Sequence, residues 1–293
     1  MAAMRHRSLA LAALLVTVLI WGTTFVATKI ALREVQPLGL TLLRFLLGLT
    51  VLLPLAWFEQ RRAGGKLVWR QLALAGLLGG CLFFALQNLG LVYTTAAKGS
   101  LIVGSVPALT AILSVILLHE RTSPVRSAGV VASVVGVAII VAGDGEPLWQ
   151  GGSLLGDLLM LGSALTWALY TVQVKSLENQ MRPAVLSAAS VGFGAIFLLP
   201  LVGWETLAHP WLPPSVDAWT AIAYLGLVAS AVPFLLWNFA LTRVDASEAA
   251  VYTNVVPLVA LAGAVLLLGE AVAPQHLLGG LLVLGGVWAA GAK

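Results

Sequence analysis

The sequence predicts an all-α membrane protein with ten transmembrane helices in two inverted five-helix repeats. Of its 293 residues, 60% are apolar and only 10% are charged, whereas soluble domains carry about 25% charged residues. The apolar residues come in blocks of about 20, the length at which a helix crosses about 30 Å of hydrocarbon. One stretch also occurs twice, because Asn88–Glu120 returns as Asn238–Glu270 at a constant offset of 150 residues.

Matches between non-apolar residues make chance an unlikely source of this repeat. Without a gap, the register pairs Asn88 with Asn238, Pro107 with Pro257, Glu120 with Glu270, Pro124 with Pro274, Gly129 with Gly279 and Gly136 with Gly286. A second match, at an offset of 146, pairs Trp21 and Lys29 with Trp167 and Lys175. The four-residue difference falls in the loop between the second and third predicted helices.

The first apolar run follows Arg5 and Arg7 and resembles a signal peptide, but it is too long for an h-region, so we interpret it as an uncleaved helix. The ten predicted helices are Ser8–Ala31, Leu38–Trp57, Gln71–Tyr93, Ala97–Leu118, Pro124–Gly143, Ser153–Val174, Pro183–Val202, Ala218–Leu241, Ala249–Leu268 and His276–Ala290. The polar, glycine-rich segment DGEPLWQGG is the natural boundary between the halves. We therefore expect two domains, residues 8–143 and 153–291.

The distribution of Lys and Arg predicts the orientation. With a cytoplasmic N-terminus, twelve basic residues fall in cytoplasmic segments and only two, Arg33 and Lys98, in outer loops. Because positive charge concentrates on the cytoplasmic side, both termini are predicted to be cytoplasmic. Five helices per half make the second repeat enter the membrane from the opposite side. Inverted repeats are typical of secondary transporters, which bind solute near mid-membrane between the halves.

Three motifs carry a family resemblance over essentially the whole chain. They are LIWGTTFVATKIAL in the first helix, the intramembrane LLRF at Leu42–Phe45, and the NLGLVYTTAAKGSLI…P…E pattern of each half. With these motifs the chain resembles the drug/metabolite transporter superfamily, specifically the bacterial type with two EamA repeats. The resemblance implies export of small metabolites, most often amino acids of the aromatic or threonine/homoserine kind, from a bacterial cytoplasmic membrane. It also implies a cavity lined by the first four helices of each half.

Arg44 is the clearest candidate for solute binding. A charge inside hydrocarbon requires a partner or a cavity, and Arg44 lies too deep in its predicted helix to escape easily. Its guanidinium has two interpretations. It pairs with a substrate carboxylate, or it has a structural role, bonding backbone carbonyls or reaching Glu34 or Asp157. Lys29 and Lys175 lie near helix ends, where lysine usually extends to the interface.

Three amides are further candidates. Asn88 and Asn238 are repeat mates, so their side chains fit hydrogen bonding between helices as well as substrate contact. Gln87 has no polar repeat mate, which favours a cavity position.

Four aromatic residues, Trp21, Trp167, Tyr170 and Tyr252, lie inside helices rather than in the interfacial belt. Helical spacing places Trp21 and Trp167 on half-polar, half-aromatic stripes. Such stripes suit either core packing or the wall of a cavity.

Other residues are predicted to have structural roles. Small residues at four-residue spacing, such as Ala128, Ala132 and Gly136, predict close packing of the fifth and tenth helices. Pro107 and Pro257 predict kinks, and Glu120 and Glu270 are expected to brace the turn that follows each.

No carboxylate lies clearly at mid-membrane, where proton-coupled carriers usually place one. Asp157 and Glu248 are the nearest candidates. We therefore expect facilitated diffusion or exchange without a dedicated carboxylate.

The rival classes lack their motifs. No P-loop is present, and no H-E-x-x-H or G-x-S-x-G sequence indicates an enzyme, so catalytic residues, metal ligands and cofactors are not expected. The positive net charge is explained by topology, and no nucleic acid is predicted as a partner. A solute channel, or a transporter of other metabolites or drugs, remains an alternative. The expected partners are a small solute and the lipid bilayer, and a monomer is sufficient.

Overall fold

A computed structural model describes residues 2–63, 67–118, 124–142, 152–177, 181–208, 213–244, 249 and 252–291. Within these ranges every regular element is helical. Seven helical segments are long and apolar enough to cross a membrane, and two shorter apolar helices cover residues 127–142 and 255–268. The all-helical membrane class predicted from the sequence is therefore confirmed.

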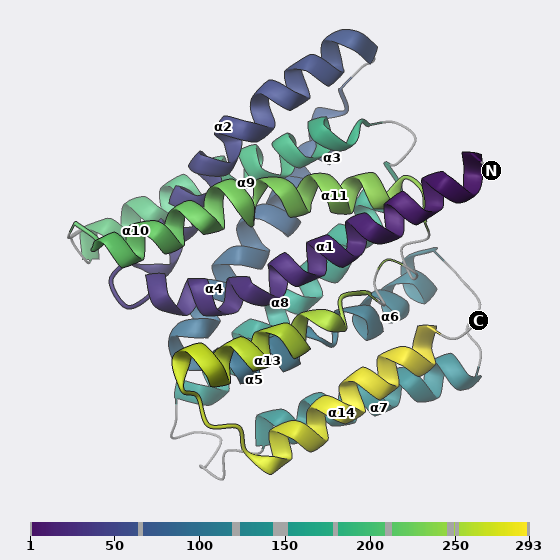
Figure 1. The fold of residues 1–293 in the computed structure, drawn as a ribbon, viewed down its shortest axis with the longest axis vertical. Helices are drawn as coiled ribbons and strands as arrows, with labels where there is room; N and C mark the ends of the chain where they lie inside the picture. The colour runs from purple at the N-terminus through teal and green to yellow at the C-terminus, as the bar shows by residue number, and fades with distance from the viewer. Residues whose placement is uncertain are drawn as a thin grey trace.

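The helices pack as a layered bundle with α7 and α14 along one side (Figure 1). Their bounds are α1 Ala2–Ala31, α2 Pro37–Ala63, α3 Trp69–Ala75, η1 Gly76–Leu82, α4 Phe83–Tyr93, α5 Ala96–Val103, α6 Val106–Leu118, α7 Pro124–Ala142, α8 Gly152–Lys175, α9 Pro183–Ala208, α10 Val216–Ala223, η2 Tyr224–Val228, α11 Ala231–Leu241, α13 Val255–Leu268 and α14 Pro274–Gly291.

The third and eighth predicted helices are interrupted by π-helical segments, η1 and η2, which the sequence analysis did not anticipate. In η2 the amide of Ala229 donates to the carbonyl of Tyr224, five residues back, at 2.9 Å. Pro233 has no N–H to donate to Ala229, which favours the wider turn at this point. Such π-segments often occur at functional positions.

The kinks predicted at Pro107 and Pro257 are complete helix breaks. The first break, at Gly104–Ser105, separates α5 from α6, and the second, at Thr253–Asn254, precedes α13. Each break lies just before its proline, because a proline leaves the carbonyl four residues earlier without its helical donor. The two breaks touch: a Cβ atom on Gly104 would lie 2.9 Å from Cγ of Pro257.

Helices α2 and α9 are longer than predicted and cap each other. Both carboxylate oxygens of Glu205, near the end of α9, accept hydrogen bonds from the first amides of α2, at Leu38 (3.1 Å) and Gly39 (2.7 Å). In return, Glu59 near the end of α2 accepts from the amide of Ala184 at 3.0 Å. Capping with a carboxylate satisfies amides that a helix start leaves unpaired and favours the positive end of its dipole. The two helices therefore run antiparallel.

The α7 and α14 pair is in close backbone contact, as the small-residue spacing predicted. A Cβ atom on Gly136 would lie 2.6 Å from the carbonyl oxygen of Gly279. Gly286 approaches the carbonyl of Gly129 equally closely. Within the described residues, neither helix carries a buried charge in the part where they meet.

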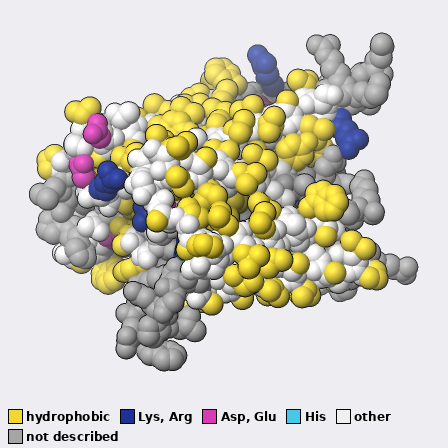
Figure 2. All heavy atoms as spheres, turned by 60° about the horizontal axis from the view of Figure 1, so that its bottom comes forward, with side chains coloured by type: hydrophobic (Ala, Val, Ile, Leu, Met, Phe, Trp, Pro, Cys, Tyr) yellow, Lys and Arg dark blue, Asp and Glu magenta, His cyan; other side chains and the backbone are white. Residues whose placement is uncertain are grey.

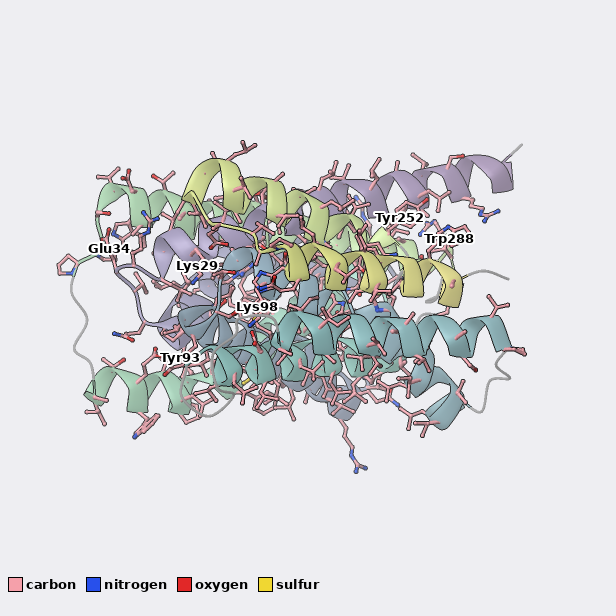
Figure 3. All side chains as sticks on the ribbon, turned by 90° about the horizontal axis from the view of Figure 1, so that it is seen from below. Lys29, Glu34, Tyr93, Lys98, Tyr252 and Trp288 are labelled. Atoms are coloured by element: carbon pink, nitrogen blue, oxygen red, sulfur yellow. The ribbon has the colours of Figure 1, made fainter. Side chains whose placement is uncertain are left out.

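The molecule has two ends, which we name after residues labelled in Figure 3. Glu34, Tyr93 and Lys29 lie toward one, the Glu34 end, and Trp288 toward the other, the Trp288 end. Both chain termini lie on the same side of the bundle (Figure 1). Hydrophobic side chains cover the middle of the face in Figure 2, and charged ones gather toward its edges.

The exposed carboxylate of Glu34 holds the start of α10. It accepts one hydrogen bond from the hydroxyl and one from the amide of Ser215, both at 2.7 Å. These bonds stabilise the charged form of Glu34 and hold its pKa below the usual value. The bond from the Ser215 hydroxyl has the larger effect and the bond from the amide the smaller one.

Candidate functional site

A cavity of about 50 Å³ lies in the centre of the bundle, where the two helix breaks meet. It is mostly apolar, and its polar side chains come from α1, α2, α4 and the second break. The lining residues are Trp21, Thr24, Phe25, Arg44, Phe83, Phe84, Gln87, Val103, Gly104, Val106, Trp167, Thr253 and Val256. A mostly apolar cavity with few convergent polar groups is typical of a small-molecule site.

Arg44 reaches this cavity from α2 and is only 1% exposed. Its Nε donates to the hydroxyl of Ser230 at 3.0 Å, and its guanidinium carbon lies 4.4 Å above the ring of Phe84. Ser230 itself donates to the carbonyl of Leu225, so its lone pairs are free to accept. Among the described residues, no carboxylate pairs with Arg44 and no group accepts from its two Nη atoms. The structural alternatives offered from the sequence, Glu34 and Asp157, are both engaged elsewhere.

Gln87 lines the same cavity and is buried, with 6% of its surface exposed. Its amide has no hydrogen-bond partner among the described residues. A buried amide without a partner is costly unless water or a ligand satisfies it. Arg44 and Gln87 thus bring a charged donor and a neutral amide to the same space.

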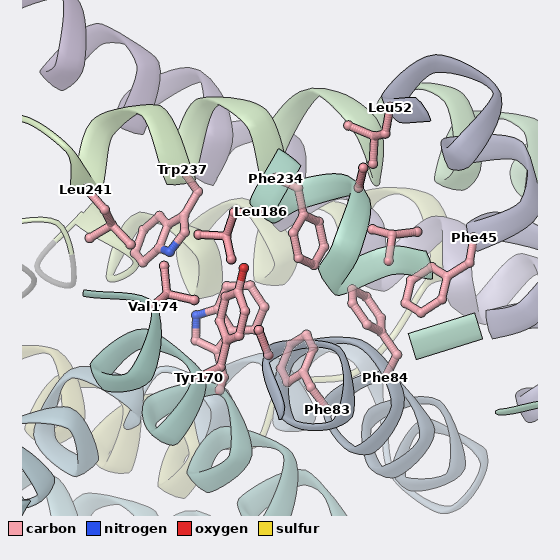
Figure 4. Close-up of a cluster of buried hydrophobic side chains, with 14 of the residues drawn as sticks. Phe45, Leu52, Phe83, Phe84, Tyr170, Val174, Leu186, Phe234, Trp237 and Leu241 are labelled. Atoms are coloured by element: carbon pink, nitrogen blue, oxygen red, sulfur yellow. The ribbon is translucent and has the colours of Figure 1, made fainter. Parts of the chain in front are cut away.

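Trp21 and Trp167 form the aromatic wall of the cavity. Their rings meet edge to face at 5.1 Å, and Trp167 also contacts Phe83 at 4.7 Å. Behind them Tyr170, Phe234 and Trp237 continue the cluster into the core (Figure 4). The two tryptophans therefore do both things that the sequence left open, packing on one face and lining the cavity on the other.

The two asparagines lie outside the cavity lining and join helices within each half. Nδ2 of Asn88 donates to the hydroxyl of Thr41 at 2.8 Å, and Nδ2 of Asn238 donates to the hydroxyl of Ser187 at the same distance. Asn238 also accepts from the hydroxyl of Tyr170 at 3.4 Å. This geometry favours the helix-pairing interpretation for both residues.

Of the eight candidates, Trp21, Arg44, Gln87 and Trp167 line the cavity together, and Asn88, Tyr170, Asn238 and Tyr252 do not. Tyr252 is half-buried beside the second break and packs against two of the three clusters of buried hydrophobic side chains. Sequence analysis missed Phe83, Phe84 and Thr253. The offset of 150 offers a signal for Thr253, because it is the repeat mate of Val103, at the first break.

Lys98 was predicted in an outer loop, which is wrong. It is in the first turn of α5, 2% exposed, and its ammonium lies 2.7 Å from the carboxylate of Asp157 on α8. Thr94 donates a further hydrogen bond to that carboxylate at 3.1 Å. Asp157 is therefore a neutralised carboxylate rather than an open one.

Glu270 caps a helix of the first half. Its two oxygens accept from the amides of Ala96 and Ala97, at 3.0 and 2.9 Å, which begin α5. The sequence had suggested that it braces the following turn. Its mate Glu120, and Glu248, lie outside the described residues.

A bundle of long apolar helices around a small, mostly apolar cavity is typical of a polytopic membrane protein that binds a small solute. Models of the EamA-like transporter family match residues 8–142 and 154–291. The chain belongs to the EamA-like transporter family.

Three relatives match almost end to end. An "Uncharacterized transporter" of Archaeoglobus fulgidus is 32% identical, over 96% of each chain. A "Probable terminal-alkyne amino-acid exporter" of Streptantibioticus cattleyicolor is 28% identical, over 94% of this chain and 91% of its own. A "Probable amino-acid metabolite efflux pump" of Escherichia coli is 29% identical, over 94% and 92%. The names of the family and of these relatives describe transport and indicate no catalytic activity.

A solved structure shares the fold. It superposes with a TM-score of 0.68 at 22% identity, covering 97% of this chain and 96% of its own.

Proposed function

We propose that the chain is a ten-helix, inverted-repeat carrier that exports amino acids across a bacterial cytoplasmic membrane. The central cavity is its solute site. Arg44 binds the carboxylate of the solute, Gln87 binds a second polar group, and Trp21 and Trp167 flank the apolar part. Names of two relatives as amino-acid exporters support this solute class.

One observation carries the proposal: two buried polar side chains line the same apolar cavity, and among the described residues neither the two Nη atoms of Arg44 nor the amide of Gln87 has a hydrogen-bond partner. Arg44 is held by Ser230 through Nε alone, which leaves its Nη pair to bind a carboxylate. Hydrogen bonds between guanidinium and carboxylate are short, directional and about twice as strong as neutral ones. A carboxylate supplied by the solute therefore completes a site that the fold leaves incomplete.

Paired contacts support the inverted arrangement. The caps of Glu59 and Glu205 exchange roles between α2 and α9 at an offset of 146. The contacts of Asn88 with Thr41 and of Asn238 with Ser187 repeat in the two halves. Because α2 and α9 are antiparallel, the operation that relates the halves turns one upside down. With the bias of basic residues, this makes the Glu34 end the outer one.

The cavity is too small for an amino acid as it stands, since about 50 Å³ has room for a few waters. Transport then requires the halves to separate around it. The breaks at Gly104–Ser105 and Thr253–Asn254 are the points at which the lining bends, because they lack continuous helical hydrogen bonds. Exchange needs no proton-carrying carboxylate, since Lys98 already neutralises Asp157.

The decisive experiment is counterflow of a labelled amino-acid panel in liposomes that hold the purified protein. We expect saturable exchange of one class of amino acid, lost in Arg44→Gln. Arg182→Gln, an exposed arginine at the Trp288 end, is the matched control and keeps full exchange. Since Arg44→Gln also removes the Ser230 contact, a second variant is Gln87→Glu. Its carboxylate pairs with Arg44 and blocks the site while the protein stays folded in size-exclusion chromatography.

Two results contradict the proposal. Exchange unaffected by either cavity variant removes the site assignment. Flux that is not saturable and shows no counterflow identifies a channel instead.

A further inference from the structure

A second pocket opens at the Glu34 end between α1, α4 and the end of α13. It has a volume of about 320 Å³ and is lined by Lys29, Leu32, Arg33, Leu91, Val92, Leu268 and Glu270. Unlike the central cavity it is open and equally polar and apolar. Three of its side chains carry charge, two positive and one negative.

The two repeat-matched lysines behave differently. At the Trp288 end, the ammonium of Lys175 donates to the carbonyls of Leu241 and Val244, at 3.3 and 3.2 Å. Lys29 has no such bond to a described residue, and it faces the pocket, where its opposite charge is Glu270. Lys29 is half-buried, so its ammonium has lost part of its water without gaining the contacts of its mate.

Glu270 is held in place by the amides of Ala96 and Ala97. Each carboxylate oxygen has two lone pairs, so one on each oxygen remains free. A fixed carboxylate beside two cations matches the two charges of an amino acid. The carboxylate of the solute suits Lys29 and Arg33, and its ammonium suits Glu270.

The pocket continues the central cavity along the same two helices. On α1, Phe25 lines the cavity and Lys29 the pocket, and on α4, Gln87 lines the cavity and Leu91 the pocket. Each pair is four residues apart, about 6 Å along a helix. Leu91 lines the pocket and is 1% exposed. A solute that leaves the cavity along α1 and α4 toward the Glu34 end would pass Leu91 and enter the pocket.

We propose that Lys29, Arg33 and Glu270 form an outer solute site for zwitterionic amino acids, distinct from the central site. This inference rests on the proposed function, because in export the solute reaches the outer site after it is released from Arg44. The site holds the solute by its charges, and the described residues that line it include no aromatic side chain. It therefore accepts amino acids with less regard to side chain than the central cavity does.

A chemical footprint tests the site without transport. Lys29 of the full protein in detergent is acylated with an amine-reactive ester, and its modification is followed by mass spectrometry. Glycine betaine is the probe, because it is a zwitterion without a reactive amine. We expect betaine to slow acylation of Lys29 about three- to fivefold, as suits a partly exposed charge contact. Protection is lost in Glu270→Gln, and Lys175 is the internal control.

Acetate and choline separate the contribution of the carboxylate of betaine from that of its quaternary ammonium. Weaker protection by acetate and none by choline supports zwitterion recognition. Equal protection by acetate and betaine overturns the role of Glu270, and no protection by betaine overturns the site.

Transport kinetics then distinguish this inference from the proposed function. Arg33→Gln is expected to raise the KM for solute presented at the outer face about three- to fivefold. The inner-face KM is unchanged, and Arg182→Gln changes neither. If both faces respond equally, or neither does, the outer site is wrong while carrier activity dependent on Arg44 still stands. If no variant or wild-type protein exchanges amino acids, the proposed function fails instead.

Discussion

The interface of α2 with α4 and that of α9 with α11 are built alike, whereas the two polar side chains Arg44 and Gln87 of the cavity have no such counterparts. Asn88 bonds Thr41 in one interface, and their repeat mates Asn238 and Ser187 bond in the other. In the cavity, the mate of Arg44 is Ser190 and the mate of Gln87 is Trp237. Polar residues that recur stabilise the fold, because both halves need the same hydrogen bonds between helices. We propose that the polar residues that occur once and keep unfilled hydrogen-bonding capacity, Arg44 and Gln87, contact the solute.

The largest expected effect concerns the ion pair of Lys98 with Asp157. This pair occurs in one half only, but each of its charges has a partner. Breaking a buried pair from one side costs about 3–5 kcal/mol, because the other charge stays buried. We expect Lys98→Met or Asp157→Leu to lower the thermal stability strongly. The double variant recovers most of it and still exchanges solute. Loss of exchange in a stable double variant would place the pair in transport.

Gln87 tests the polar residues that occur once and have no hydrogen-bond partner among the described residues. We expect Gln87→Leu to keep or raise thermal stability, since it removes a buried amide without a protein partner. Losing its bond to the solute raises KM in exchange about tenfold, which corresponds to about 1.4 kcal/mol. Unchanged KM with lowered stability would give Gln87 a structural role instead.

Asn88 and Asn238 test the polar residues that recur in both halves. Asn88→Leu and Asn238→Leu are each expected to cost about 0.6 kcal/mol and at most about 1.7 kcal/mol, the average and the maximum measured for side-chain hydrogen bonds between membrane helices. The two losses should agree, and KM should stay at the wild-type value. A raised KM in either variant would show contact with solute.

The sequence predicted what depends on hydrophobicity and repetition. Apolar blocks and the match of Asn88 with Asn238 were sufficient for the helical class, and four of the eight candidate site residues line the cavity. Burial of charge was harder to predict. Lys98 looked like a loop residue because its partner, Asp157, lies 59 positions away and hydropathy does not pair residues. Glu205 was placed in a loop because polar helix ends resemble loops until the capped amides are seen.

The faces of helices were also beyond the sequence. The sequence analysis did not single out Phe83 and Phe84, and the π-segment directly before them changes the faces that a regular helix would predict. The cavity lining at Thr253 depends on the break before Pro257. Both features arise from hydrogen bonds between residues that a periodic pattern treats as regular helix.

The smallest effect concerns the surface bond of Glu34 to Ser215. Its pKa is lowered in the folded protein, so the bond stabilises the fold above the unfolded pKa and is lost as pH falls through the folded value. We expect Glu34→Gln to lower the melting temperature slightly at neutral pH. The difference from wild type should vanish in acid, and a difference that grows in acid would reverse the sign.

The reciprocal caps of α2 and α9 also bear on how the protein is made. The first amides of α2 are satisfied by a residue 166 positions later in the chain. The cap of α2 thus exists only once the second half of the chain has been made, and the cap of α9 by Glu59 likewise depends on the first half. We expect each half alone to leave these helix starts to water.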